Sequence, residues 1–83
     1  MEFLLVRFPR TREVLVDGHP NGWTNTIIPL PAGTYTVALG TPRDFSPDEQ
    51  KIHLEFTAAL DPYTVTFHVL PPSAIQPAPG TPP

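Results

Sequence analysis

The fold is decided by the stretch VLVDGHPNGWTNTIIPLPAGTYTVAL, which spans residues 14–39. It opens with Val14 and Val16, which have one residue between them. It closes on a run over 35–39 in which large apolar residues again take every second position. This period of two is typical of a β-strand that packs one face on a hydrophobic core. The stretch therefore predicts a strand at each of its two ends.

Turn residues separate these strands at short intervals. Asp17-Gly18 and Asn21-Gly22 bracket a predicted tight turn, because glycine adopts the positive φ that such turns require. Pro31-Ala32-Gly33 predicts a second turn, which leads into Tyr35. We interpret these residues, Asp17, Gly18, Gly22, Pro31, Gly33 and Tyr35, as a structural signature of the fold.

The same alternation continues on both sides of the central stretch. No segment shows the helical period, so we predict an all-β fold. Six to seven short strands at this spacing predict a small antiparallel β-sandwich or a small barrel. The residues expected to point inward are Leu4, Val6, Phe8, Ile52, Leu54, Phe56, Tyr63, Val65, Phe67 and Val69.

Two connections carry more specific expectations. Ser46-Pro47-Asp48-Glu49 has the form of a helix N-cap with proline at the first helical position, which predicts one helical turn. Asp61-Pro62 predicts the last turn of the chain. The last two long strands would pair as a hairpin about Ala59-Leu60.

The chain divides into a domain over 1–70 and a tail over 71–83. Nearly half of the tail is proline, which predicts an extended or disordered segment that acts as a linker. Pro79 and Pro82 also have the PxxP spacing of a recognition motif, although a proline-dense tail generates this spacing by chance.

Composition restricts the classes of function. The 83 residues carry a net charge of −3, which disfavours nucleic-acid binding, and they include no cysteine for a disulfide or a thiolate metal site. No apolar run is long enough to span a membrane or to act as a secretory signal. We therefore expect a cytoplasmic protein if the chain is complete, whereas the location of a fragment of a larger exported protein would stay open.

The central stretch resembles the signature of PEGA domains, which are small bacterial β-sandwich modules. In that signature a strand ends in Val-Asp-Gly, a Gly and a Thr follow, and Pro-x-Gly-x-Tyr-x-Val enters the next strand. The matching positions here are Val16, Asp17, Gly18, Gly22, Thr24, Pro31, Gly33, Tyr35 and Val37. The resemblance covers about residues 2–70, although the segment that names the family reads Pro9-Arg10-Thr11-Arg12 here.

The resemblance implies a small antiparallel β-sandwich of prealbumin-like or immunoglobulin-like topology that serves as an accessory module and has no established catalytic residues. The chain itself agrees with this expectation, because its two serines, Ser46 and Ser73, occupy a predicted turn and the tail. We also expect no cofactor. His53 and His68 on the predicted hairpin, with Glu55 as a third ligand, could form a weak zinc site, or they could be solvated histidines. His19 lies in a predicted turn and is expected to be exposed.

Two features suggest contact with a partner. Trp23, the sole tryptophan, either anchors a contact or folds over the open end of the core. The cluster of Arg7, Arg10 and Arg12 is expected to face outward, where it could hold an acidic protein surface or protect a strand edge from aggregation.

These features lead to one main hypothesis and two alternatives. The main hypothesis is a non-catalytic module that contacts another protein or has a structural role. The first alternative is a small carbohydrate-binding module that uses Trp23 with Tyr35 or Tyr63. The alternation of inward and outward positions along each strand (strand parity) nevertheless places both tyrosines inward. Self-association through exposed sheet edges is the second.

Overall fold

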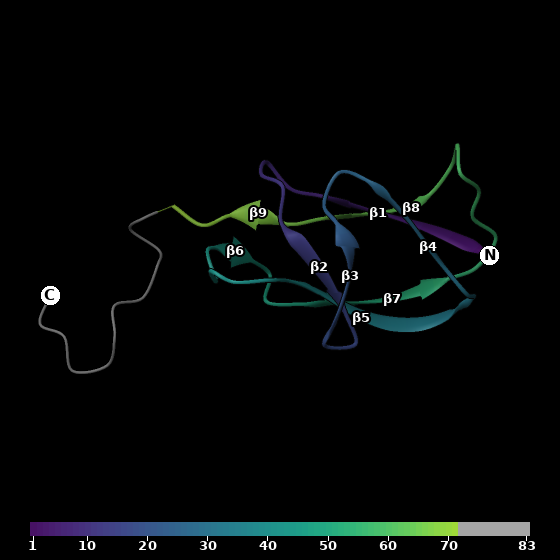
Figure 1. The fold of residues 1–83 in the computed structure, drawn as a ribbon, viewed down its shortest axis with the longest axis horizontal. Helices are drawn as coiled ribbons and strands as arrows, with labels where there is room; N and C mark the ends of the chain where they lie inside the picture. Colours follow the sequence, from purple (N-terminus) through teal and green to yellow (C-terminus); the bar gives the residue numbers. More distant parts are fainter. Residues whose placement is uncertain (72–83) are drawn as a thin grey trace, which may run out of the picture.

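The computed structural model describes residues 1–71, so the predicted tail lies outside the described residues except for Pro71. The described chain consists of strands and contains no helix, which confirms the predicted all-β class (Figure 1). No segment of it is a helix that could span a bilayer. Its strands are β1 (Glu2–Arg7), β2 (Glu13–Val16), β3 (His19–Trp23), β4 (Ile27–Leu30), β5 (Gly33–Leu39), β6 (Phe45–Ser46), β7 (Gln50–Leu54), β8 (Tyr63–Thr66) and β9 (His68–Val69).

These strands form three sheets. One has the order β4-β1-β8, a second has the order β3-β2-β5-β7, and β6 pairs with β9 in a two-stranded ribbon. All pairs are antiparallel except β1 and β8, which run parallel with Leu4 opposite Tyr63. The sequence predicts antiparallel pairing throughout, so the mixed first sheet is a difference from that expectation.

The tight turn that Asp17-Gly18 and Asn21-Gly22 are expected to bracket lies at Asp17-Gly18 itself. Val16 pairs with His19, and the two residues between them have φ of 51° and 82°, the positive values that a two-residue hairpin turn requires. Asn21-Gly22 was expected to flank the turn but lies inside β3. The pairing register of β2 and β3 shifts at this point, and Gly22 takes a φ of 99°, which marks a β-bulge.

The hydrophobic core is a single cluster to which both larger sheets contribute. The aromatic rings of Phe8, Phe45 and Phe67 meet edge to face at one end of it, with centroid distances of 6.4 and 5.7 Å. The alternation of apolar residues therefore predicts the core well. Its buried members are Leu4, Val6, Phe8, Val14, Val16, Ile28, Leu30, Val37, Leu39, Phe45, Ile52, Leu54, Val65 and Phe67.

Three expectations about local structure are wrong. Phe56 is 91% exposed rather than buried, because β7 ends at Leu54 and the chain turns at Phe56 with a φ of 58°. Tyr63, also expected to point inward, is 40% exposed at the start of β8. The helical turn predicted over 46–49 is absent, because Ser46 pairs with His68 as part of the β6–β9 ribbon.

The hairpin predicted about Ala59-Leu60 also does not join the long strands. β7 pairs with β5 and β8 pairs with β1, so the two strands lie in different sheets. Only a local bridge between Ala58 and Asp61 forms around the predicted turn. Strand parity identifies the buried face of each strand but does not identify its neighbour, which explains this error.

Candidate functional site

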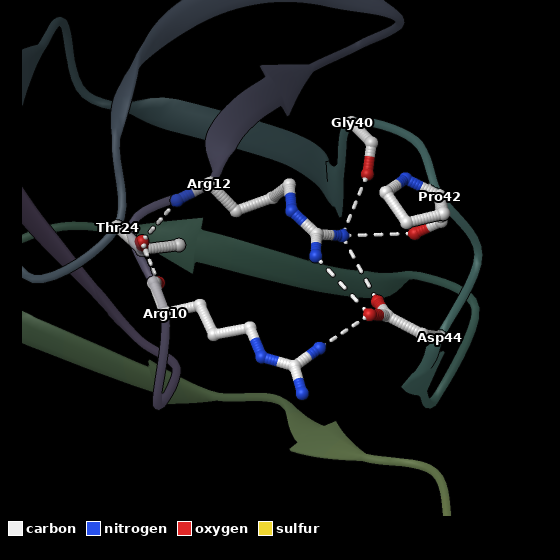
Figure 2. A network of polar contacts seen from close by, with 6 residues as sticks. All are labelled: Arg10, Arg12, Thr24, Gly40, Pro42 and Asp44. Carbon is white, nitrogen blue, oxygen red and sulfur yellow. Dashed lines mark hydrogen bonds and ion pairs between the residues drawn. The ribbon is translucent and has the colours of Figure 1, made fainter. Parts of the chain in front are cut away.

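Arg12 lies at the centre of a polar network that joins the β1–β2 loop to the β5–β6 connection (Figure 2). Its Nη1 donates to the carbonyl oxygens of Gly40 and Pro42 at 3.2 and 2.8 Å and to Oδ1 of Asp44 at 2.9 Å. Its Nη2 donates to Oδ2 of Asp44 at 3.2 Å, and Arg10 donates to the same oxygen at 2.7 Å. Both arginines therefore converge on one carboxylate.

Thr24 fixes the backbone that carries these arginines. Its side chain is 2% exposed, accepts a hydrogen bond from the Arg12 backbone nitrogen at 2.8 Å, and donates to the Arg10 carbonyl at 2.7 Å. Asn25 makes a similar pair of side-chain bonds with the backbone of Phe8. The β1–β2 loop is thus held by side chains from the β3–β4 connection.

The network sets the charge state of Asp44. The hydrogen bond from Arg12 lowers the pKa of this carboxyl below its ordinary value, against an opposing effect of partial burial. The Arg12 side chain is only 11% exposed and its guanidinium carbon lies 5.3 Å from the centre of the Phe8 ring. Arg12 is therefore part of the folded framework rather than the outward-facing patch expected from the sequence.

The other two arginines are more accessible but do not form one patch with it. Arg10 keeps 56% of its side chain exposed while it bonds to Asp44. Arg7 is exposed at the end of β1 and, within residues 1–71, has no ion-pair partner. It borders an open pocket of about 300 Å³, which is also lined by Phe8, Pro9, Asn25, Thr66, Phe67 and His68.

Trp23 does not close the core, which was one of its two expected roles. It ends β3, an edge strand, opposite Glu13, and 52% of it is exposed. Tyr35 is half-buried and donates its hydroxyl to the Pro31 carbonyl at 2.6 Å, which joins two residues of the predicted turn signature. Tyr35 therefore supports the turn and does not extend a ring surface next to Trp23.

The histidines expected to face one another lie on different strands of different sheets. His53, on β7, contacts Thr34 Oγ1 at 3.0 Å and Glu55 Oε2 at 3.1 Å. His68 lies on β9, and His19 is exposed at the start of β3. In the part of the chain that the structure describes, no three side chains of the metal-ligating types come together. The predicted hairpin that would have placed His53 beside His68 does not form, so the geometry does not support the zinc hypothesis.

Sequence reasoning missed a group of exposed apolar side chains, which we call the apolar end: Met1, Phe56, Leu60 and Tyr63. Leu60 is fully exposed, and Met1 is 75% exposed. Met1 directly precedes β1, Phe56 and Leu60 lie on the β7–β8 connection, and Tyr63 begins β8. The start of β1 and this connection lie at the same end of the molecule (Figure 1). The signal in the sequence was the loss of alternation after Phe56. Phe56 itself continues the alternation of Ile52 and Leu54, which concealed the end of β7 at Leu54.

The apolar end is held in place by Glu2 and Thr57. Both the backbone nitrogen and the hydroxyl of Thr57 donate to Glu2 Oε1, at 2.8 and 2.7 Å, and the Phe3 backbone nitrogen donates to the Thr57 hydroxyl at 2.7 Å. The side-chain hydrogen bond from Thr57 lowers the pKa of Glu2. The connection that displays Phe56 and Leu60 is therefore anchored to β1 at Thr57 and closed locally by the Ala58–Asp61 bridge.

Comparison with known proteins finds no relative of this chain. No family model matches the chain, and no curated protein or solved structure matches it.

Proposed function

We propose that this chain is a non-catalytic module that binds another protein through its apolar end. The observation that carries the proposal is the exposure of Phe56 and Leu60, at 91% and 100%, on one short connection. These two side chains contribute little to folding where they stand. Burial of each in an interface would contribute about 1.5–3 kcal/mol.

The anchoring of the connection supports the same role. A contact segment that is already ordered loses less conformational entropy on binding than a free loop. Thr57 supplies that order through its bonds to Glu2 and Phe3. Aromatic side chains such as Phe56 are enriched in the buried core of protein interfaces. A few residues near the centre of an interface contribute most of its affinity.

For the fold we propose a β-sandwich of the PEGA-like kind. The supporting observation is that inward residues of the sheets β4-β1-β8 and β3-β2-β5-β7 belong to one hydrophobic cluster. Accessory modules of this family in bacterial proteins have no catalytic residues, which agrees with a binding or structural role. A sandwich type alone does not specify a function, so the proposal depends on the apolar end.

The test compares a variant that removes both exposed side chains, Phe56→Ser with Leu60→Ser, with a control that removes an apolar side chain elsewhere. Ile27→Ser is a suitable control, because Ile27 is 37% exposed on β4. A protein partner recovered by affinity purification should bind the control normally and the double variant at least about tenfold more weakly. Equal binding by the double variant would refute the proposal.

A second candidate function, carbohydrate binding, is favoured by the half-exposed ring of Trp23. An exposed indole can stack on a sugar ring, and it reports on that contact by fluorescence. Because the chain has one tryptophan, a change in emission on addition of a sugar would come from this site alone. Unchanged emission across a panel of oligosaccharides would remove this candidate.

A further inference from the structure

The free edge of β7 differs from the other sheet edges in that its backbone is open to a new strand. Asp17 N donates to the Thr36 carbonyl at 2.8 Å, and Thr36 N donates to Asp17 Oδ1 at 2.8 Å. The backbone groups of one residue in a strand point to the same side, so Thr36 bonds toward β2 and not toward β7. Lys51, which is opposite Thr36, therefore directs its N–H and C=O to the free edge, and so does His53 two residues later.

On each of the remaining edges of the two larger sheets, a proline or an existing hydrogen bond removes part of the backbone pairing capacity. Pro20 interrupts the donors of β3, which also carries the bulge at Gly22. Pro29 removes a donor from β4. On β8 the Thr66 carbonyl already accepts a bond from Gln50 Nε2 at 2.8 Å. β7 is thus the proline-free edge with successive open positions among the described strands of these sheets.

The sequence of this edge is self-complementary. β7 ends with Lys51-Ile52-His53-Leu54 and Glu55 follows it directly, so residues 51–55 read as a cation, an apolar residue, a histidine, an apolar residue and an anion. Paired antiparallel with a second copy about His53, the segment places Lys51 opposite Glu55 of the partner subunit, and Ile52 opposite Leu54 of the partner subunit. Opposite charges across an antiparallel pair are stabilising, and a two-fold axis repeats each contact.

The charges also select this register over its neighbours. Pairing centred on Ile52 would place Glu49 opposite Glu55 of the partner subunit, and pairing centred on Lys51 would place the two lysines opposite each other. Like charges directly opposite are destabilising. Glu55 and His53 are 51% and 60% exposed, so both side chains are accessible to a second chain.

We propose that two copies of this chain associate through β7, antiparallel and centred on His53, so that the sheet β3-β2-β5-β7 continues into its copy. The interface lies on the strand edge and does not use Phe56 or Leu60. The homodimer and the binding of another protein by the apolar end can therefore fail independently.

The principal test is a charge exchange measured by sedimentation equilibrium. Lys51→Glu should weaken dimerisation at least about tenfold, because it turns both cross-strand ion pairs into like-charge pairs. Lys51→Glu combined with Glu55→Lys should restore it to within about threefold of the wild type. Arg7→Glu changes the net charge by the same amount away from β7, so it should leave the dimer intact.

A cysteine cross-link tests the register directly, because the chain has no cysteine of its own. In a hydrogen-bonded antiparallel pair the Cα atoms lie about 5.5 Å apart, within the range of a disulfide. His53→Cys should therefore form a dimer on mild oxidation, whereas Thr64→Cys on β8 should not. A wild-type chain that stays monomeric at millimolar concentration, or a dimer that the charge exchange leaves unchanged, would overturn the proposal.

Discussion

Arg12 and Asp44 form a two-pronged ion pair, with Nη1–Oδ1 at 2.9 Å and Nη2–Oδ2 at 3.2 Å, and the Arg12 side chain is 11% exposed. The pair fastens the start of β2 to the connection that leads into Phe45, a buried ring of the core. Parallel bonds from a guanidinium to a carboxylate are among the stronger polar contacts in proteins. This pair therefore positions a loop on which the aromatic end of the core depends.

We expect Asp44→Asn to lower the free energy of unfolding by about 2 kcal/mol near neutral pH, because it removes a charged acceptor of Arg12 and Arg10. The exposed pair of Arg43 and Asp48 provides a matched control, with side chains 69% and 79% exposed. Asp48→Asn should change the stability by less than about 0.5 kcal/mol. Urea unfolding of both variants measures the difference.

The same pair predicts how stability depends on pH. Because the hydrogen bond from Arg12 lowers the pKa of Asp44 in the folded state, the unfolded state binds more protons between the two pKa values. The free energy of unfolding should therefore fall as the pH falls below about 4, the usual value of an unfolded aspartate. The difference in free energy of unfolding between the wild type and Asp44→Asn should become smaller across this range. A constant difference down to about pH 2 would contradict the assignment.

Thr24→Val should destabilise the protein by about 1–3 kcal/mol, because it leaves the Arg12 N–H and the Arg10 carbonyl without their buried partner. Thr26 is exposed on the same connection, so Thr26→Val should have little effect. Thermal unfolding of the two variants side by side checks this. Similar losses in both would show that the hydroxyl of Thr24 does not carry the stabilisation.

Gly22→Ala should cost more stability than Gly18→Ala. Both glycines have a positive φ, so both substitutions introduce backbone strain of about 1–3 kcal/mol. A Cβ at Gly22 would lie 2.9 Å from Ile28 Cγ1 in the core, whereas a Cβ at Gly18 would meet nothing within 4 Å. Denaturant midpoints of the two variants isolate the steric contribution at the bulge, and equal midpoints would exclude it.

Phe67→Ala should destabilise the protein by about 3–5 kcal/mol, since Phe67 is 1% exposed and packs against Phe45. Phe56→Ala should leave stability nearly unchanged, because Phe56 is 91% exposed. Calorimetry of both variants measures the two losses of stability. A large loss for Phe56→Ala would mean that this ring packs on the domain, and the apolar end would then lose its main member as a contact surface.

Much of the fold could be predicted from alternation and turn chemistry. The period of two correctly placed residues such as Leu4 and Val37 in the core. The positive φ of Gly18 also follows from the turn chemistry of the sequence. Both inferences are local, because each depends on neighbours in the chain. The confirmed all-β class rests on them.

The arrangement of strands and the candidate site could not be predicted in this way. The parallel pair of β1 and β8 depends on which edge is free after the other strands have packed, and parity carries no such information. Arg12 precedes β2 in an irregular loop, where the rule of alternating faces no longer applies, and its carboxylate partner is 32 residues away. Phe56 misled the prediction because β7 ends at Leu54, two residues before it.

The parallel pairing of β1 with β8 has a consequence for the order in which the protein is made. β1 is synthesised before the other described strands, yet one of its two neighbours in the sheet, β8, follows only after β7. In a nascent chain that has not reached Thr66, the backbone of β1 is therefore unpaired along one edge. The side chains of Leu4 and Val6 then lack part of the core packing that buries them in the folded protein. Contacts between distant segments of this kind slow folding and leave growing chains prone to pair with one another.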